Sequence, residues 1–585
     1  MNNPFIALMR LTWKFARGSR RTLITAYALL AISNIVDMAR PLFFAMLLNT
    51  VQKGGDHLVR DVLLILAAYY TIPFFFWMFH GTGRVLEQRV SFQVVKRYRE
   101  HLFTSITEMP LEWHKNHHSG DTIDRVKKAT VALSDFSGET WVSVSIIMRL
   151  IIAFGAIIWA APLFGGVALV LCIGVIATIL AFDRRLNRLQ TEINGHDHHI
   201  ASTVHDYITN IITVITLRIE GMARKMVSKR IAAQFEPQKR FILLNEIKWF
   251  TVSMMLSVVS FLLLAFHLGH YLSSGQAILI GTITMLYQYV DRMNGAFFDF
   301  AWQYEQILRR CINTQAVDPI LNDHRLFYSG DQCRVVDRWQ RIEIDHLYFT
   351  HQTEDQEREH LSDIHIDLVR GRKIALVGES GSGKSTLMVL LRGLLKSDRV
   401  EVTVDGKAFD SLGCLKDLST LIPQEPETFD NTIDYNIAAG VAHQSEDTEV
   451  AAQIACFDQV VARLPRGYES HMSERGVNLS GGEKQRLALA RGVFAAHSSS
   501  LILLDEPTSS VDAVNEGRIY QNLFRHFAGL CIVSSIHKLH LLTMFDWIYI
   551  LDQGRVVEEG AFQELLAGQG LFAAMWQSYQ AAGAE

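Results

Sequence analysis

The pattern of hydrophobic and polar positions divides the chain into two parts. Up to about residue 305, long runs of Leu, Ile, Val, Phe and Ala dominate, whereas beyond about residue 330 the apolar runs are shorter, as in a soluble α/β domain. The apolar core of a bilayer is about 30 Å thick, and a helix crosses it with about 20 apolar residues. Six segments meet this requirement and predict membrane-spanning helices: 22–50, 58–80, 138–160, 163–183, 249–270 and 275–302. We therefore predict an all-α transmembrane domain over 1–315, a linker over 316–335 and an α/β domain over 336–585.

The positions of lysine and arginine predict how these spans are oriented. The long segments between spans two and three and between spans four and five are rich in both residues, whereas the turns at 160–166 and 269–276 contain neither. Basic loops stay on the cytoplasmic side. Both long loops and both termini are therefore predicted to be cytoplasmic. The loops are rich in helix-forming residues, so we expect the membrane helices to continue into the cytosol, and residues 1–21 predict an amphipathic helix at the interface.

Several charged residues fall inside the predicted spans. They are Asp37, Arg40, Arg149, Asp291, Arg292 and Asp299. Charges that face lipid are costly, so these side chains are expected to point into a water-filled cavity or to pair with one another. Asp37 and Arg40 stand three positions apart on a helix and suit a simple pair. If the charges line a cavity, they favour a polar or charged transported substrate over a lipid.

Composition narrows the classes of function. A chain of 585 residues is too long for one hydrophobic core, so two or more domains are expected. The net charge of −4 gives no sign of a nucleic-acid partner. The six cysteines are scattered without a C-x-x-C pair, which indicates neither a disulfide framework nor a cysteine zinc site.

A glycine-rich motif introduces the chemistry of the α/β domain. Residues 378–385 read Gly-Glu-Ser-Gly-Ser-Gly-Lys-Ser, after a strand-like run and before a helical one. This is the context of a phosphate loop, whose backbone N–H groups turn toward phosphate oxygens. Lys384 would neutralise the β- and γ-phosphates, and the Ser385 hydroxyl would reach Mg²⁺. Further along, the apolar run 501–504 ends in Asp505 and Glu506, which suit the second shell of Mg²⁺ and a general base for water.

A second motif makes the assignment specific. Leu-Ser-Gly-Gly-Glu stands at 479–483, about a hundred residues after the phosphate loop. With this spacing, the C-terminal half resembles the nucleotide-binding domain of ATP-binding-cassette (ABC) proteins. The six spans with two long cytoplasmic loops resemble the transmembrane domain of ABC exporters, which implies a half-transporter with both domains in one chain. The resemblance also places coupling helices within 112–121 and 210–221 and the exporter X-loop at 473–476.

The resemblance implies roles for the site residues. Gln424 would be the Q-loop glutamine that touches Mg²⁺, His537 the switch histidine at the γ-phosphate, and Asp512 part of the D-loop. The implied catalytic residues are Glu506, His537, Gln424 and Lys384. The implied ATP-binding residues are Gly378, Glu379, Ser380, Gly381, Ser382, Gly383, Lys384, Ser385, Thr386, His351, Ser480, Gly481, Gly482 and Asp512. The implied Mg²⁺ site is formed by Ser385, Gln424 and Asp505.

Two features of the resemblance bear on selectivity and assembly. His351 stands in the register where the family usually has a tyrosine that stacks on adenine, so base selectivity would be relaxed. In the family, Ser480 and Gly482 close over the nucleotide held by Lys384 of another chain. One chain would therefore need a second copy of itself or a related half-transporter, and the intact catalytic set favours a homodimer.

Two groups of histidines offer a competing chemistry. His114, His117 and His118 form one group, and His196, His198 and His199 form the other. His114 and His118 have the spacing of metal ligands on a helix. Both groups fall in the cytoplasmic extensions, and solvated surface histidines are the favoured interpretation.

The whole pattern implies an ATP-hydrolysing transporter that exports a polar, charged or amphipathic small molecule or peptide. It would lie in the cytoplasmic membrane, in contact with lipid, with its ATPase domain in the cytosol. Three alternatives stay open. These are an importer built on the exporter fold with a siderophore- or vitamin-like substrate, one half of a heterodimer, and an ATP-gated channel or regulatory membrane protein.

Overall fold

The computed structural model describes residues 3–117, 119–160, 162–274, 279–328, 338–353, 356–472 and 479–582. It divides into two compact units. One consists of Met1–Glu108 with Ser119–His324, and the other of Met109–His118 with Arg325–Glu585.

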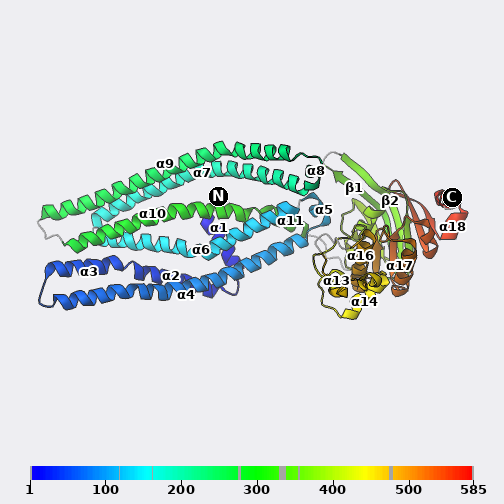
Figure 1. The fold of residues 1–585 in the computed structure, drawn as a ribbon, viewed down its shortest axis with the longest axis horizontal. Helices are drawn as coiled ribbons and strands as arrows, with labels where there is room; N and C mark the ends of the chain where they lie inside the picture. The colour runs from blue at the N-terminus through cyan, green and yellow to red at the C-terminus, as the bar shows by residue number, and fades with distance from the viewer. Residues whose placement is uncertain are drawn as a thin grey trace. The chain divides into compact units, whose positions relative to one another are not determined.

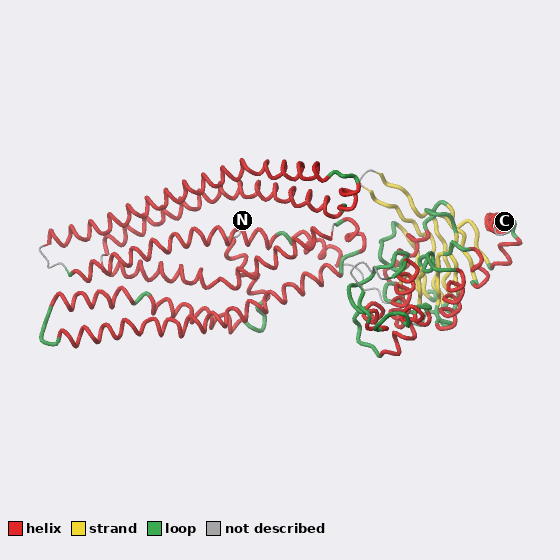
Figure 2. The backbone as a smooth tube through the Cα atoms, in the orientation of Figure 1, coloured by secondary structure: helices red, strands yellow, loops and turns green. Residues whose placement is uncertain are grey.

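The first unit is built from helices that run alongside one another, five of them long (Figure 1, Figure 2). Its helices are α1 (Pro4–Phe15), α2 (Arg20–Asp37), α3 (Arg40–Lys53), α4 (Leu58–Thr107), α6 (Ser119–Ala160), α7 (Pro162–Thr209), α8 (Ile211–Thr216), α9 (Glu220–Ser274), α10 (Ile280–Gln315) and the part of α11 (Asp318–Tyr328) up to His324. The longest, α9, has 55 residues. At 1.5 Å per residue this is more than twice the thickness of a bilayer core, so the helix extends beyond the membrane as expected.

Four helical segments in the described part of the chain are long and apolar enough to cross a membrane. They are Arg20–Lys53, Leu58–Thr107, Ser119–Ala160 and Glu220–Gly269, and they contain predicted spans one, two, three and five. Predicted spans four and six fall in α7 and α10. Residues next to the start of both helices lie outside the described part, and these two spans stay predictions.

The first predicted span is confirmed as one apolar segment, but it consists of two helices. The segment is divided into α2 and α3 at Met38 and Ala39. Pro41 stands at the second position of α3. Proline lacks the N–H that would continue a helix but fits the first turn of a new one. Helix α11 lies within the predicted linker.

Ion pairs join the charged residues Asp37, Arg40, Arg149, Arg292 and Asp299 of the predicted spans. Asp37 pairs with Arg292 of α10 at 2.7 Å and with Arg40 at 3.1 Å. Arg149 of α6 pairs with Asp299 of α10, also at 2.7 Å. These side chains neutralise one another, which removes most of the cost of placing them among apolar helices.

A fully buried ion pair joins three helices of the same unit. Lys248 of α9 has no exposed side-chain surface, and its Nζ lies 3.1 Å from Asp183 Oδ1 of α7. Glu305 of α10 approaches the same ammonium at 3.8 Å. A small cavity next to this cluster is lined by both polar and apolar residues of the three helices, among them Asn187, Gln190 and Phe241.

The second unit contains two β-sheets. An antiparallel sheet has the order β2-β1-β4-β5, and a mainly parallel sheet has the order β10-β9-β3-β8-β7-β6. The strands are β1 (Arg341–Thr353), β2 (Gln356–Val369), β3 (Lys373–Val377), β4 (Arg399–Val404), β5 (Lys407–Phe409), β6 (Ser419–Ile422), β7 (Leu501–Leu504), β8 (Cys531–Ser535), β9 (Trp547–Asp552) and β10 (Arg555–Gly560). The parallel strands β3, β7 and β8 are buried along their whole length and mostly apolar, as in a sheet that is covered on both faces.

Helices complete this unit. They are α5 (Leu111–Asn116), α12 (Lys384–Leu391), α13 (Ile433–Ala438), α14 (Ser445–Ile454), α15 (Asp458–Val461), α16 (Gly481–Ala495), α17 (Ala513–His526), α18 (Phe562–Ala567) and α19 (Leu571–Ala582). In the sheet order β3-β8-β7-β6, neighbouring strands are parallel, so their carboxyl ends meet at one edge. Ligand sites of α/β proteins form at that edge.

Candidate nucleotide site

The phosphate loop connects β3 to α12 and has the backbone that its glycines permit. Gly381 and Gly383 have φ values of 85° and 104°, which residues with a Cβ rarely adopt. Lys384 begins α12 and is buried, and its Nζ donates hydrogen bonds to the carbonyl oxygens of Gly378 at 2.8 Å and Glu379 at 2.9 Å. Burial lowers the pKa of Lys384, while the nearby Glu506 and Asp505 oppose this shift. The ammonium is thus held beside the loop where phosphate oxygens would bind.

The two carboxylates at the end of β7 are fixed by hydroxyl groups. Ser385 Oγ donates a hydrogen bond to Asp505 Oδ1 at 3.1 Å. Ser535, at the end of β8, donates to the same oxygen at 2.9 Å and accepts a bond from the N–H of Glu506 at 2.8 Å. Glu506 itself has a φ of 46°, a strained value for a residue other than glycine. Ser535 therefore fixes both the first carboxylate and the backbone of the second.

Two further side chains hold the carboxylate of Glu506. Gln424, after β6, donates from Nε2 to Glu506 Oε2 at 2.8 Å. His537, after β8, places Nε2 at 2.5 Å from Glu506 Oε1. The sheet order brings these residues to one edge, although Gln424 is 82 positions and His537 is 31 positions from Glu506 in the chain.

The donor set near the loop suits a hard cation. Ser385 and Asp505 offer oxygen atoms, which are the ligands that Mg²⁺ prefers. Gln424, the third residue of the implied Mg²⁺ site, instead bonds to Glu506 in this structure. Ser385 and Asp505 are thus the pair that the fold brings together for Mg²⁺.

The Leu-Ser-Gly-Gly-Glu motif forms the N-terminus of α16. Ser480 is the N-cap of this helix and exchanges capping hydrogen bonds with Glu483. Ser480 and Gly481 are exposed, whereas a Cβ on Gly482 would lie 2.6 Å from the carbonyl oxygen of Ser510. The hydrogen bond from the Ser480 N–H lowers the pKa of Glu483, helped by Arg463 at 2.7 Å.

The remaining implied nucleotide residues are placed as follows. Glu379, Ser380 and Gly381 are exposed, while Ser382 is buried. Thr386 lies in the first turn of α12. Asp512 is the N-cap of α17 and accepts a hydrogen bond from the N–H of Asn515 at 3.0 Å, which lowers its pKa. The side chain of His351 and residues 473–476 lie outside the described part of the structure.

The sequence analysis missed two residues that organise this site. Gln485 of α16 donates from Nε2 to the carbonyl oxygen of Glu506 at 3.0 Å, and its Oε1 accepts a bond from the N–H of Ser510 at 2.8 Å. Ser535 is the other. Both are buried polar residues, and buried polar groups are usually hydrogen-bonded, but α16 is rich in polar residues and gave no local signal for Gln485.

Short helices lie at both predicted coupling positions. Helix α5 falls within 112–121 except for its first residue, and α8 falls within 210–221. In α5, the His117 ring stacks on Trp113 with ring centroids 4.2 Å apart. Among the side chains that the structure describes, neither predicted histidine group forms a cluster of three metal-capable residues. His118 and the side chain of His198 are outside that set.

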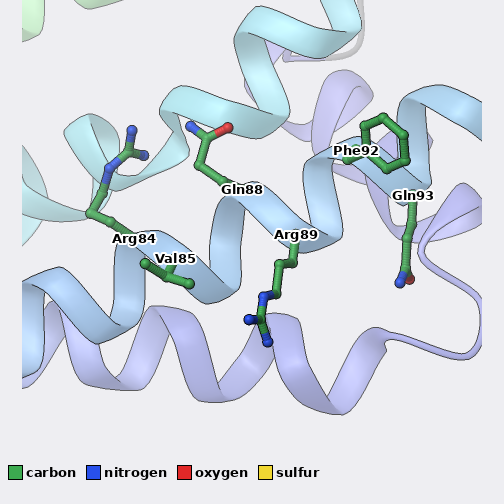
Figure 3. Close-up of a pocket in the computed structure, with 6 residues that line it drawn as sticks. All are labelled: Arg84, Val85, Gln88, Arg89, Phe92 and Gln93. Atoms are coloured by element: carbon green, nitrogen blue, oxygen red, sulfur yellow. The ribbon is translucent and has the colours of Figure 1, made fainter.

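An open hollow on the helical unit is lined by residues of α4 alone. Its lining residues are Arg84, Val85, Gln88, Arg89, Phe92 and Gln93 (Figure 3). Arg84 and Gln88 both donate to the carbonyl oxygen of Gly138 of α6, at 2.6 and 3.0 Å. A hollow with one helix as its wall does not enclose a ligand, so we assign it no part in nucleotide binding.

The chain matches two family models. The model of the ABC transporter transmembrane region matches residues 23–297, and that of the ABC transporter ATPase domain matches residues 361–509. The fold is similar to a solved structure of a bacterial Atm1-family ABC exporter with ATP bound. The TM-score is 0.82 with 22% identity, covering 96% of this chain and 98% of that one.

Two relatives illustrate the similarity. An ATM1-type heavy metal exporter of Novosphingobium aromaticivorans is 25% identical over 583 residues, which cover 97% of this chain and 93% of the relative. ATP-binding cassette sub-family B member 6 of Rattus norvegicus is 27% identical over 503 residues, which cover 82% of this chain. The chain spans 57% of the length of that rat protein. By these matches the chain belongs to the ABC transporters, as a half-transporter of the exporter type in which the transmembrane region and the ABC domain are fused in one chain.

Proposed function

We propose that two copies of this chain form an ATP-driven exporter in the cytoplasmic membrane, with two ATP molecules bound head to tail between their ATPase domains. The exposed N-terminus of α16 carries this proposal. Ser480 and Gly481 are exposed there, and the N-terminus of a helix attracts phosphate. Each chain has one such motif and one phosphate loop, so a second copy would supply the missing half of each site.

The geometry supports distinct roles around each ATP. Lys384 would bind the β- and γ-phosphates, and Ser385 and Asp505 would hold Mg²⁺, which supplies charge neutralisation when bound. Glu506 would accept the proton of the attacking water as the bond between the γ-phosphorus and the bridging oxygen breaks and ADP leaves. For this step, Gln424 and His537 must first release the carboxylate oxygens that they hold. His537 would then turn to the γ-phosphate.

We assign the coupling of hydrolysis to transport to α5 and α8. Each is a short helix between two long ones, α5 between α4 and α6, and α8 between α7 and α9. Trp113 of α5 is buried, and α5 groups with the ATPase unit. A short helix fixed in this way can transmit a movement of the ATPase domain to the two helices that it joins.

The transported substrate is proposed to be a polar, charged or amphipathic small molecule or peptide. The ion pairs Asp37–Arg292 and Arg149–Asp299 support this class, because their side chains keep between 24% and 47% of their surface exposed within the isolated helical unit. Charged side chains within spans tend to line a water-filled path. The name of the Novosphingobium relative, a heavy metal exporter, also fits a polar cargo.

Cysteine cross-linking tests the head-to-tail arrangement. Ser380 and Ser480 are both exposed, whereas the described native cysteines are buried. A Ser380→Cys/Ser480→Cys chain that also carries Glu506→Gln, trapped with ATP and oxidised, is expected to form covalent dimers. Each single-cysteine variant is the matched control and should stay monomeric on a denaturing gel. A double variant that stays monomeric with ATP bound would contradict the arrangement.

A further inference from the structure

A cluster of imidazole and carboxylate groups on β1 and β2 has no part in the nucleotide chemistry above. His346, Asp363 and His365 each offer one metal-capable atom, and these atoms all lie within 4.8 Å of one another. We propose that these three residues bind a zinc ion and that Asp345 is a positioning residue for His365. The site would be a second cation site of the ATPase domain, distinct from the proposed Mg²⁺ residues Ser385 and Asp505.

Two β-bulges bring these residues together. Ile344 pairs with Ile366 and Leu347 with Ile364, so Asp345 and His346 together oppose His365 alone. On the partner strand, the next register shift leaves Asp363 outside the regular pairing. His346 and Asp363 have φ values of 51° and 53°, as a bulge allows. Bulges re-aim side chains, and here they turn residues of both strands to one point.

The distances suit a metal ion. His346 Nδ1 lies 2.8 Å from Asp363 Oδ1, and His365 Nε2 lies 3.4 Å from the same oxygen. Ligands that bind zinc at about 2.0 to 2.1 Å in tetrahedral geometry stand about 3.4 Å apart. Small side-chain rotations therefore suffice to close three ligands around one ion.

A carboxylate orients the second histidine. Asp345 Oδ1 lies 2.9 Å from His365 Nδ1 and can accept its N–H. With that bond made, Nε2 of the neutral ring carries its lone pair toward Asp363 Oδ1, and either a metal ion or a proton on Nε2 would separate the two acceptors. Metal-binding histidines show this arrangement, with the other ring N–H donated to a carboxylate. Tyr348 gives Asp363 a further hydrogen bond.

The donor set and the exposure point to zinc. Two imidazoles and one carboxylate are the ligands of zinc sites that keep a fourth position for water. The three side chains are each nearly half exposed, at 45% to 48%, so an ion can enter from solvent and keep a water molecule. Elsewhere in the same unit, His471 and Asp430 form an isolated pair at 3.5 Å with similar chemistry, which provides a matched control.

Zinc binding by the full chain tests the proposal. The chain would be purified with a histidine-free tag in lipid nanodiscs, stripped with a chelator and titrated with Zn²⁺ against a chromophoric competitor. His346→Ala and His365→Ala are each expected to bind one zinc ion fewer per chain than the wild type, while His471→Ala matches the wild type. Asp345→Asn should keep the zinc stoichiometry but weaken that site about 10- to 100-fold.

Binding of Co²⁺ distinguishes a metal site from a protonated ion pair. Co²⁺ bound by His346, Asp363 and His365 should give visible absorption that His365→Gln removes, with ATP binding of each variant as the check on folding. The proposal is overturned if His346→Ala and His365→Ala bind as much zinc as the wild type with equal affinity. It is also overturned if Co²⁺ adds no visible absorption that depends on these histidines. That result would mean that the cluster is a protonated ion pair and not a metal site.

Discussion

Gln424 donates a hydrogen bond from Nε2 to Glu506 Oε2 at 2.8 Å and so ties the loop after β6 to the carboxylate at the end of β7. His537 holds the other carboxylate oxygen of Glu506. The proposed general base is thus held from both sides by the two residues proposed to sense Mg²⁺ and the γ-phosphate. Binding of ATP would compete for these side chains and free the carboxylate for the attacking water.

The first prediction concerns His537. Replacing it with alanine should lower ATP hydrolysis by about 10²-fold or more, because the residue proposed to contact the γ-phosphate is lost, while ATP affinity changes little. Steady-state hydrolysis and equilibrium nucleotide binding measure the two effects. His540→Ala is the matched control, since His540 lies 3.8 Å from Glu516 instead of contacting Glu506. Hydrolysis at the wild-type rate by His537→Ala would contradict the assigned role.

The second prediction compares two adjacent glycines. A Cβ on Gly482 would lie 2.6 Å from the backbone oxygen of Ser510, whereas a Cβ on Gly481 meets no atom within 4 Å. Gly482→Ala should therefore lower the stability of the ATPase domain by about 1 to 3 kcal/mol, as overpacking does. Gly481→Ala should be neutral or slightly stabilising because alanine favours a helix. Thermal unfolding checks this, and equal melting temperatures for the two variants would refute the packing argument.

The third prediction concerns the buried Lys248–Asp183 pair. Lys248→Ala leaves an uncompensated buried carboxylate and should cost about 3 to 5 kcal/mol, seen as a lower melting temperature in nanodiscs. Adding Asp183→Asn should recover part of that loss, because the unpaired charge is removed. Lys96→Ala breaks the exposed Lys96–Glu100 pair and should change stability by about 0.5 kcal/mol at most. If Lys248→Ala and Lys96→Ala lower the stability equally, burial does not determine the free-energy cost of breaking an ion pair.

The fourth prediction is a pH dependence at the N-terminus of α16. The Ser480 N–H and Arg463 hold the pKa of Glu483 below its value of 4.5 in an unfolded chain. A depressed carboxylate pKa stabilises the folded state above the unfolded value, and this stabilisation is lost as pH falls through the folded value. Glu483→Gln should therefore lower the melting temperature at pH 7 relative to the wild type, and the difference should shrink below about pH 4. A difference that stays constant down to pH 3 would contradict this origin.

Local motifs allowed much of the nucleotide site to be predicted from the sequence. A phosphate loop is one short segment whose glycines, lysine and serine stand together, and the predicted strand and helix on either side of it are present as β3 and α12. The long helices followed from apolar length and helix-forming loops in the same way. In each case, the pattern and the structure that it predicts occupy the same stretch of chain.

Features that depend on strand order and register escaped the sequence analysis. Ser535 meets Glu506 across 29 positions, and Asp345 meets His365 across 20, through pairings that no local pattern specifies. The division of the first span at Met38 was also missed, although Pro41 was a visible signal. Of the histidines that the sequence grouped in clusters, His114 lies on α5 and His196, His198 and His199 lie on α7, whereas those that the fold gathers, His346 and His365, are 19 positions apart in the chain.

ATP hydrolysis by this chain alone in lipid nanodiscs, compared with Glu506→Gln, tests the central claim most directly. The account predicts Mg²⁺-dependent turnover by the wild type that falls by about 10²-fold or more in the variant, with ATP binding retained by both. That result would show that one kind of chain is sufficient to build complete ATP sites. A folded wild-type chain that binds ATP but shows no turnover above Glu506→Gln would contradict the self-sufficient homodimer.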